Sequence, residues 1–151
     1  MDLRAELMPP SVGRQGLDEL SSEIAWIADL VLRGAENAGE EIRAFNERTG
    51  HDYVALDFAE YEGNRDLAEF VLEAARPGRP RIVDVTTDEL TEIVRRMLAG
   101  DPESDYYLRL FAANVTHPGV SDLIFHPPAE LRGASAEQIV DEALKYRPIA
   151  L

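Results

Sequence analysis

Apolar residues recur at helical spacing in most segments of this chain, and this spacing most constrains its fold. In residues 17–31, leucine, isoleucine and valine fall every three or four positions, which places them on one side of a helix. The pattern recurs in later segments, whereas the alternation typical of strands is weak and has only residues 81–85 as a candidate. The spacing therefore predicts an all-α fold.

Glycine, proline and asparagine mark the expected helix ends in the first half. Gly50 predicts the end of a helix that begins near Glu40, because glycine readily adopts the left-handed conformation there. Asn64 predicts the start of a further helix, which Pro77 terminates. Residues 51–63 are expected to form a loop with one short helical turn.

Capping patterns mark the helices of the second half. Thr86 with Glu89, and Ser135 with Gln138, have the three-residue spacing of a reciprocal capping box. Asp101 precedes a proline and predicts the cap of another helix, since proline is tolerated at the first helical position. A short helical turn is expected between this helix and the last.

Residues 76–81, Arg-Pro-Gly-Arg-Pro-Arg, form the clearest boundary in the sequence. The expected organisation is a flexible arm over residues 1–16, a helical unit over 17–77, a linker over 78–84 and a second helical domain over 85–151.

Parts of the first helical unit are similar in sequence to parts of the second. Residues 43–51 parallel residues 109–117, and residues 69–77 parallel residues 138–148. These matches suggest that 17–77 is a degenerate repeat.

The chain is strongly acidic and contains no cysteine. Its 151 residues include 15 Lys+Arg and 29 Asp+Glu, which gives a net charge of −14. There are 8 basic and 17 acidic side chains up to Pro80, and 7 and 12 after it. Such a surface repels nucleic acid and anionic lipid and favours a basic partner. The lack of cysteine excludes a disulfide scaffold, thiolate catalysis and Cys-ligated zinc.

Targeting and membrane signals are not found in the sequence. The N-terminus is acidic and too short in apolar content for a signal peptide. No apolar stretch approaches the ~20 residues that a membrane helix needs. We therefore expect a cytoplasmic protein.

A histidine and several carboxylates cluster in the first half, where they could hold a metal. The cluster consists of His51, Asp52, Asp57, Glu60 and Glu62. Its spacing matches neither HExxH nor an EF-hand loop, so a solvated loop is the favoured interpretation.

Ser121, Asp122 and His126 are close in sequence but lack a nucleophile-elbow pattern. We expect no catalytic residue, no metal and no cofactor.

Residues 117–127 read His-Pro-Gly-Val-Ser-Asp-Leu-Ile-Phe-His-Pro, and a capped helix bearing Ile139 and Val140 follows them. In this motif and in the order of its flanking helices, the chain resembles the nuclease-colicin and pyocin immunity proteins over about residues 85–147. Their signature is His-Pro, two small residues, Ser-Asp-Leu-Ile, two aromatic residues and proline. The resemblance implies a small, distorted four-helix bundle that binds a cognate nuclease toxin.

The resemblance also implies two groups of toxin-binding residues. The short-helix motif supplies Ser121, Asp122, Phe125, His126 and Pro127. The preceding helix supplies Asp101, Ser104, Asp105, Leu108 and Ala112. Phe125 and His126 stand where the family has tyrosines, and Ala112 stands where an acidic residue is usual.

The expected function is neutralisation of a basic nuclease toxin by protein–protein binding, without nucleic-acid or membrane binding. An acidic inhibitor suits a basic nuclease because opposite charges speed capture. The alternative is an acidic helical adaptor or regulator that retains the immunity fold and binds a different protein.

Overall fold

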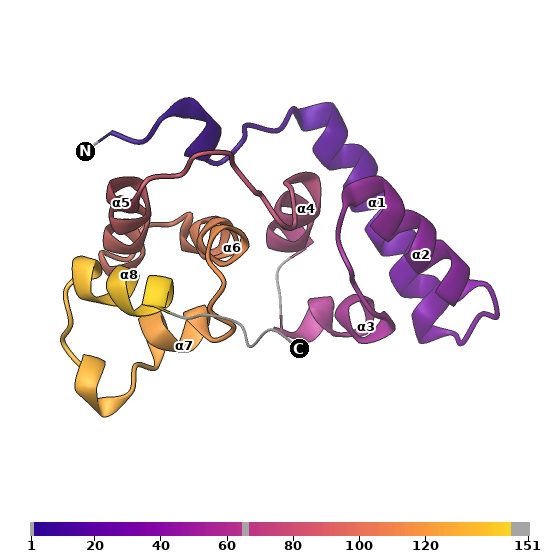
Figure 1. Cartoon of the computed structure of the whole chain (residues 1–151). Helices are drawn as coiled ribbons and strands as arrows, with labels where there is room; N and C mark the ends of the chain where they lie inside the picture. The colour runs from indigo at the N-terminus through magenta and orange to yellow at the C-terminus, as the bar shows by residue number, and fades with distance from the viewer. Residues whose placement is uncertain (1, 65–66, 146–151) are drawn as a thin grey trace, which may run out of the picture. The chain divides into compact units, whose positions relative to one another are not determined.

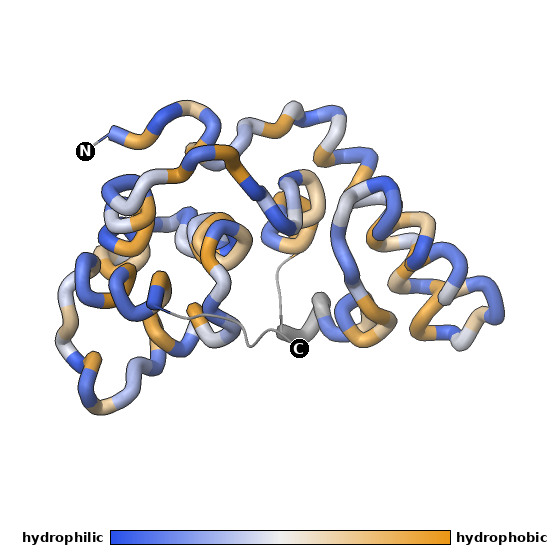
Figure 2. The backbone as a smooth tube through the Cα atoms, viewed as in Figure 1, coloured by the Kyte–Doolittle hydropathy of each residue, from blue (hydrophilic) through white to orange (hydrophobic). Residues whose placement is uncertain are grey.

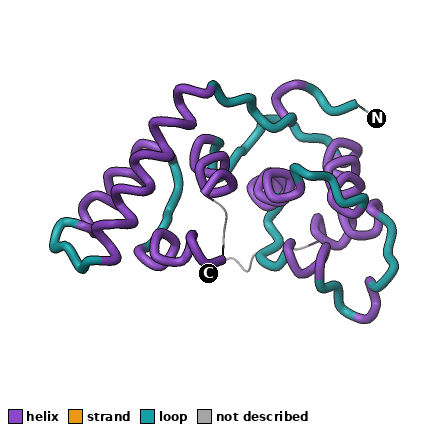
Figure 3. The backbone as a smooth tube through the Cα atoms, turned by 180° about the vertical axis from the view of Figure 1, so that it is seen from behind, coloured by secondary structure: helices purple, strands orange, loops and turns teal. Residues whose placement is uncertain are grey.

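A computed structural model describes residues 2–64 and 67–145, apart from the side chains of residues 61–64. In these ranges all regular structure is helical, as Figure 3 shows, which confirms the all-α prediction. None of the described helices combines the length and the apolar character needed to cross a membrane.

The chain divides into two compact units, each with its own hydrophobic core. The N-terminal unit consists of Pro10–Gly78. The C-terminal unit consists of Arg79–Leu151 together with Met1–Pro9. The division after Gly78 lies inside the Pro/Gly/Arg-rich segment 76–81.

The N-terminal unit contains four α-helices (Figure 1): α1 (Arg14–Leu32), α2 (Ala38–Thr49), α3 (Ala55–Asn64) and α4 (Leu67–Ala75). Helix α1 contacts each of the other three. Its Ile24 and Ile27 are fully buried beside an aromatic cluster. In that cluster Phe45 and Phe58 lie edge to face, with ring centroids 5.7 Å apart.

Helix α3 corrects the prediction for residues 51–64. The expected loop is a ten-residue helix, and Asn64 is its last residue instead of the cap of the next helix. The carboxylate of Asp57 accepts a hydrogen bond from the backbone N–H of Val54 at 2.8 Å, which satisfies a donor at the helix start. Burial of Phe58 against other rings then stabilises the helix through contacts distant in sequence.

The C-terminal unit also contains four α-helices: α5 (Thr87–Leu98), α6 (Ser104–Asn114), α7 (Val120–Phe125) and α8 (Ala136–Lys145). A 3-10 helix, η2 (Ala129–Leu131), lies between α7 and α8. In Figure 2 hydrophobic and hydrophilic positions alternate along these helices, and the hydrophobic ones form the core. Ile93, Leu110, Phe111 and Val140 are fully buried there.

Both predicted capping boxes are present. Thr86 Oγ1 accepts the Glu89 N–H at 3.1 Å while Glu89 Oε1 accepts the Thr86 N–H at 3.0 Å. Ser135 and Gln138 make the same reciprocal pair at the start of α8. The prediction for the start of α6 is wrong by two residues, because Asp101 Oδ1 accepts the Glu103 N–H and closes a turn before the helix begins at Ser104.

Residues 1–16 do not form the flexible arm expected from the sequence. Within the described part of this range, the 3-10 helix η1 (Ala5–Leu7) and Leu3 pack into the C-terminal core, where Leu7 is fully buried. Arg4 pairs with Glu89 at 2.9 Å and donates to the backbone oxygens of residues 83 and 84. The last residues of the range, from Arg14 onward, already belong to α1.

The segment that the sequence predicts as a linker, residues 78–84, is bound to the C-terminal unit from residue 79 onward. Pro80 is buried, and the Ile82 N–H donates to Asn114 Oδ1 at 3.0 Å. Residues 81–85 form no strand, because their polar backbone groups bond to side chains such as Asn114 and Arg4 and Asp84 has a positive φ of 60°.

A charged network fixes α5 to its neighbours. Glu92 accepts hydrogen bonds from Arg96 and Arg95, both at 2.9 Å, and the Arg96 bond is the main cause that lowers the pKa of Glu92. Arg96 also donates to the Tyr107 hydroxyl at 2.9 Å. The pKa of Glu89 is lowered chiefly by the backbone N–H of Thr86 that it accepts.

Acidification is expected to destabilise the C-terminal unit through these carboxylates. A carboxylate whose pKa is lowered from 4.5 by folding stabilises the folded state fully above about pH 4.5. This stabilisation is lost as the pH falls through the pKa of the folded state. The free energy of unfolding, measured from pH 7 to pH 3, should therefore fall less steeply in Glu92→Gln than in the wild type. Glu40→Gln, an exposed position on α2, is the control, and equal slopes for all three proteins would contradict the prediction.

Candidate binding face on α6 and α7

The short helix α7 has one buried and one exposed side. Val120, Leu123 and Ile124 are buried in the C-terminal core. Ser121 and Asp122 are exposed on the other side. The hydrophobic positions therefore fix the helix and leave the polar positions facing solvent, as helical periodicity requires.

The entry to α7 is set by His117. Its Nδ1 accepts a hydrogen bond from the Gly119 N–H at 2.9 Å. This nitrogen therefore contacts a residue that follows the histidine and not the carbonyls of the preceding helix. At the other end, the His126 N–H donates to the Asp122 carbonyl at 2.9 Å. These two bonds define the ends of a helix too short to be stable alone.

Asp122 and Phe125 are the most available groups of the motif. Among the described residues, the Asp122 carboxylate has no hydrogen-bond or ion-pair partner. The Phe125 side chain is 46% exposed, which is unusual for an aromatic residue next to a core. His126 is exposed and Pro127 is half-buried. The motif thus presents a free carboxylate and an exposed ring together on one short element.

Helix α6 packs against α7 and also has two sides. Tyr106, Tyr107, Leu110 and Phe111 are buried. The opposite stripe has Asp105 and Ala112 exposed and Leu108 half-buried. Leu108 contacts the core partly, so it combines packing with surface exposure.

Two predicted residues of this region have structural roles. Asp101 and Ser104 are half-buried, and the Ser104 hydroxyl donates to the Asp101 carbonyl at 2.6 Å. Together with the bond from Asp101 to the Glu103 N–H, this contact shapes the turn before α6. Their role in binding remains a prediction.

Two arginines that lie beside α6 were not predicted as candidate site residues from the sequence. Arg79 and Arg81 line a cavity of about 320 Å³ together with Ala112, Ala113 and Val115. The available signal was the excess of arginine in residues 76–81 of an otherwise acidic chain. The composition of this segment predicts a boundary between two helical units, and its position beside α6 follows only from the fold.

The carboxylate–histidine cluster considered as a metal site is dispersed into local contacts. His51 Nε2 lies 2.7 Å from the Arg76 carbonyl oxygen, and the His51 ring stacks on Tyr53. Asp57 is bonded at the start of α3, and the side chain of Glu62 lies outside the described residues. In the described part of the chain no three His, Asp or Glu side chains gather as a metal site would require.

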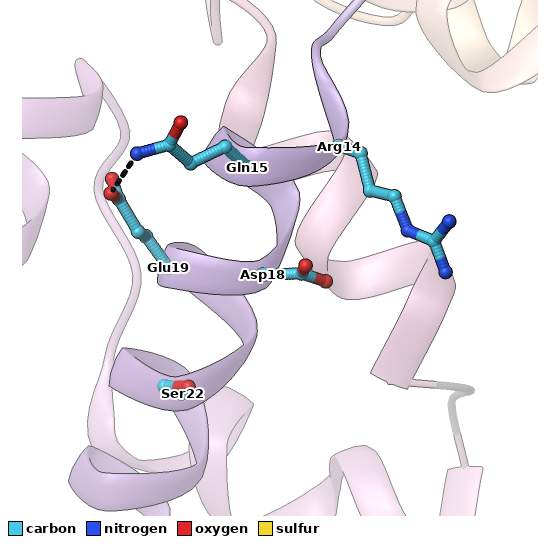
Figure 4. Close-up of a pocket in the computed structure, with 5 residues that line it drawn as sticks. All are labelled: Arg14, Gln15, Asp18, Glu19 and Ser22. Carbon is cyan, nitrogen blue, oxygen red and sulfur yellow. Dashed lines mark hydrogen bonds between the residues drawn. The ribbon is translucent and has the colours of Figure 1, made fainter.

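A shallow hollow lies along the first turns of α1 (Figure 4). It is lined by Arg14, Gln15, Asp18, Glu19 and Ser22, all from this one helix. Gln15 donates to Glu19 at 3.3 Å, and Figure 4 shows the Arg14 and Asp18 side chains on the other side of the helix from this pair. The lining belongs to one exposed helix face, and we assign it no ligand.

The comparisons with known proteins concern the C-terminal unit. No curated protein and no solved structure gives a significant match to the chain. A family match covers α5, α6, α7 and α8, together with the segment that precedes α5. Residues 82–148 match the colicin immunity protein / pyocin immunity protein family, which confirms the resemblance seen in the motif of residues 117–127.

Proposed function

We propose that this protein binds and neutralises a cognate nuclease-type bacteriocin through the exposed face of α6 and α7. The observation that carries the proposal is the family match over residues 82–148, combined with the exposure of Asp122 and Phe125 on a helix whose other side is buried. The proposed action is binding without catalysis or cofactor, in the cytoplasm of the producing cell.

Charge and shape give this face a physical basis for binding a nuclease. A carboxylate such as Asp122 accepts charge-assisted hydrogen bonds from basic side chains or backbone N–H groups of the toxin. Phe125 supplies an apolar anchor, the kind of residue that contributes most to interface energy. The net charge of −14 attracts a basic nuclease and repels the DNA that competes for it.

A second candidate is an adaptor that retains the immunity fold and binds a protein other than a toxin. The observation in its favour is that Phe125 and His126 lack the hydroxyl groups of the family's tyrosines. Tyrosine combines an apolar ring with a polar tip, so its loss changes which partner surface fits. A neighbouring gene that encodes a basic nuclease domain favours the toxin inhibitor, and a neighbouring non-nuclease partner favours the adaptor.

Co-expression tests the proposed function. We expect a neighbouring gene to encode a nuclease domain; cells that express this domain are then expected to die, and cells that also express this protein are expected to grow. A catalytically inactive nuclease is the control for toxicity. Equal killing with and without this protein, at confirmed expression of both, would overturn the proposal.

Salt is expected to slow association with the toxin more than it speeds dissociation. Long-range attraction is screened beyond a Debye length of about 8 Å at physiological ionic strength, whereas close contacts are screened less. Stopped-flow measurements from about 50 to about 500 mM salt should show the association rate constant falling about tenfold or more. An association rate that is independent of salt would contradict steering by the acidic surface.

A further inference from the structure

The segment that carries Arg79 and Arg81 is fixed against the end of α6 by one side chain. Asn114 Nδ2 donates to the carbonyls of Pro80 at 3.0 Å and Leu110 at 2.7 Å, while its Oδ1 accepts the Ile82 N–H. Pro80 is buried and Ile82 is half-buried. The two arginines alternate with these residues and are exposed, so they stand on the outer side of an anchored segment.

The cavity beside the arginines is open to a partner's side chain. Its other lining residues are Ala112, Ala113 and Val115, which are too short to cover two guanidinium groups. Within the described residues, neither Arg79 nor Arg81 makes a hydrogen bond or an ion pair. The arginines therefore do not cap the carbonyls at the end of α6, which is the structural role expected at this position.

The charge of this corner is opposite to that of the chain as a whole. Two adjacent guanidiniums without a described carboxylate partner lie in a chain of net charge −14. The planar guanidinium fits a carboxylate with two parallel hydrogen bonds. Ala112 belongs both to the cavity and to the exposed stripe of α6, so the corner adjoins the candidate binding face.

We propose that Arg79 and Arg81 form a subsite that binds an Asp or Glu side chain of the protein partner at the edge of the α6–α7 face. This inference rests on the proposed function. The face then carries charges of both signs. The carboxylates of Asp105 and Asp122 bind basic groups of the partner, and the arginine subsite binds an acidic group of the partner. The arginines repel a nuclease that is basic at this position, so the subsite favours a partner with an acidic side chain there.

Charge reversal tests the subsite. The double variant Arg79→Glu/Arg81→Glu is expected to bind the adjacent-gene nuclease domain at least about tenfold more weakly than the wild type. The control is Arg43→Glu/Arg132→Glu, which changes the same charge at two exposed arginines that also have no described partner. Circular dichroism verifies that each variant is folded.

A charge swap identifies the partner group. Among single Asp→Arg and Glu→Arg variants of the nuclease, one is expected to restore tight binding to the doubly reversed protein. Wild-type affinity in the reversed protein, or an equal loss in the control, would overturn the subsite while leaving the proposed function intact. A wild-type chain that does not bind the nuclease would overturn both.

A different observation concerns the N-terminal unit, because the end of its first helix and the start of its second recur in the C-terminal unit at one sequence distance. Helix α1 ends at Leu32 and α5 at Leu98, 66 positions later. Helix α2 begins at Ala38 and α6 at Ser104, again 66 positions later. In both units the first helix contacts the other three.

The connection between the first two helices also repeats at this distance. Gly34 and Gly100 both have a positive φ, of 66° and 78°. The backbone hydrogen bonds around the two glycines join equivalent positions. In the first turn the N–H groups of residues 34, 35 and 38 donate to the carbonyls of residues 31, 30 and 35. In the second turn the N–H groups of residues 100, 101 and 104 donate to the carbonyls of residues 97, 96 and 101. The two turns therefore have the same conformation and the same bonding.

The cores of the two units correspond as well. At the same distance the buried residues pair as Ile24 with Leu90, Ile27 with Ile93, Ala28 with Val94 and Phe45 with Phe111. In the last helices the buried residues pair 69 positions apart, as Phe70 with Ile139, Val71 with Val140 and Ala74 with Ala143. The turns, the backbone hydrogen bonds around them and the core positions therefore agree between the two units.

The binding residues do not repeat. Gly39 occupies the position that corresponds to Asp105, and Ala35 occupies that of Asp101. In the first turn of α3, the carboxylate of Asp57 accepts a hydrogen bond from the backbone N–H of Val54, whereas that of Asp122 has no described partner. The positions of the N-terminal unit that correspond to Asp101 and Asp105 therefore carry no carboxylate.

We infer that residues 10–78 are a second, diverged copy of the immunity-type unit that retains the scaffold and has lost the acidic binding positions. The chain then binds one toxin molecule, although it contains two units; this stoichiometry rests on the proposed function. Native mass spectrometry of the full chain with excess nuclease domain should show one nuclease per chain. Two per chain would overturn the loss of binding in the N-terminal unit.

An experimental structure of the full chain tests the duplication independently of any toxin. Residues 21–48 are expected to superpose on residues 87–114 in the 66-residue register. A better superposition in another register, or none, would overturn the duplication and leave the proposed function unaffected.

Discussion

Asp122→Ala and Phe125→Ala are each expected to weaken toxin binding by about 2 kcal/mol or more, which is roughly thirtyfold in Kd. Asp122 offers an exposed carboxylate without a described partner, so its removal takes away a hydrogen-bond acceptor that the free protein does not use. Phe125 is 46% exposed and loses nearly all its contact area when truncated. Isothermal titration calorimetry with the nuclease domain measures both effects.

Matched substitutions separate these effects from general changes in charge or hydrophobicity. Asp141→Ala removes an exposed carboxylate from α8, and Leu98→Ala removes an apolar side chain that is 47% exposed at the end of α5. Both controls are expected to bind within about 0.5 kcal/mol of the wild type. If Asp122→Ala and Phe125→Ala bind as well as their controls, the assigned face is wrong.

Phe111→Ala is expected to destabilise the C-terminal unit by about 3–5 kcal/mol and to abolish protection. Phe111 is fully buried on the inner side of α6, so its truncation leaves a cavity behind the candidate binding face. Denaturant unfolding followed by circular dichroism gives the change in stability, and co-expression with the nuclease gives the change in protection.

Phe45→Ala is the matched control in the other unit. Phe45 is equally buried and occupies the corresponding core position in α2. Its truncation is expected to destabilise the N-terminal unit by a similar amount while protection is retained. Loss of protection in Phe45→Ala but not in Phe111→Ala would place the toxin-binding face in the N-terminal unit.

Local signals predicted several helix ends correctly, although the local patterns at Asn64 and Asp101 did not. The capping boxes at Thr86 and Ser135, and the glycine stop at Gly50, need only neighbouring residues, and all three are present in the structure. The short helix α7 was predicted because its buried and exposed positions follow a known motif.

Contacts between distant segments account for what the sequence did not predict. Helix α3 depends on burial of Phe58 among rings from α2 and α4, and the N-terminal residues depend on Leu7 entering a core formed by α5–α8. Neither segment has a local pattern strong enough to predict its order. The same reason applies to Arg79 and Arg81, whose cavity exists only because Asn114 binds their segment to α6.

The affinity of the full chain for the nuclease domain encoded beside it tests the central claim most directly. Calorimetric titration is expected to give one-to-one binding with a nanomolar or lower Kd, and the bound nuclease is expected to lose its activity on DNA. The absence of binding at micromolar concentrations of two folded proteins, or a tight complex that still cleaves DNA, would contradict the account.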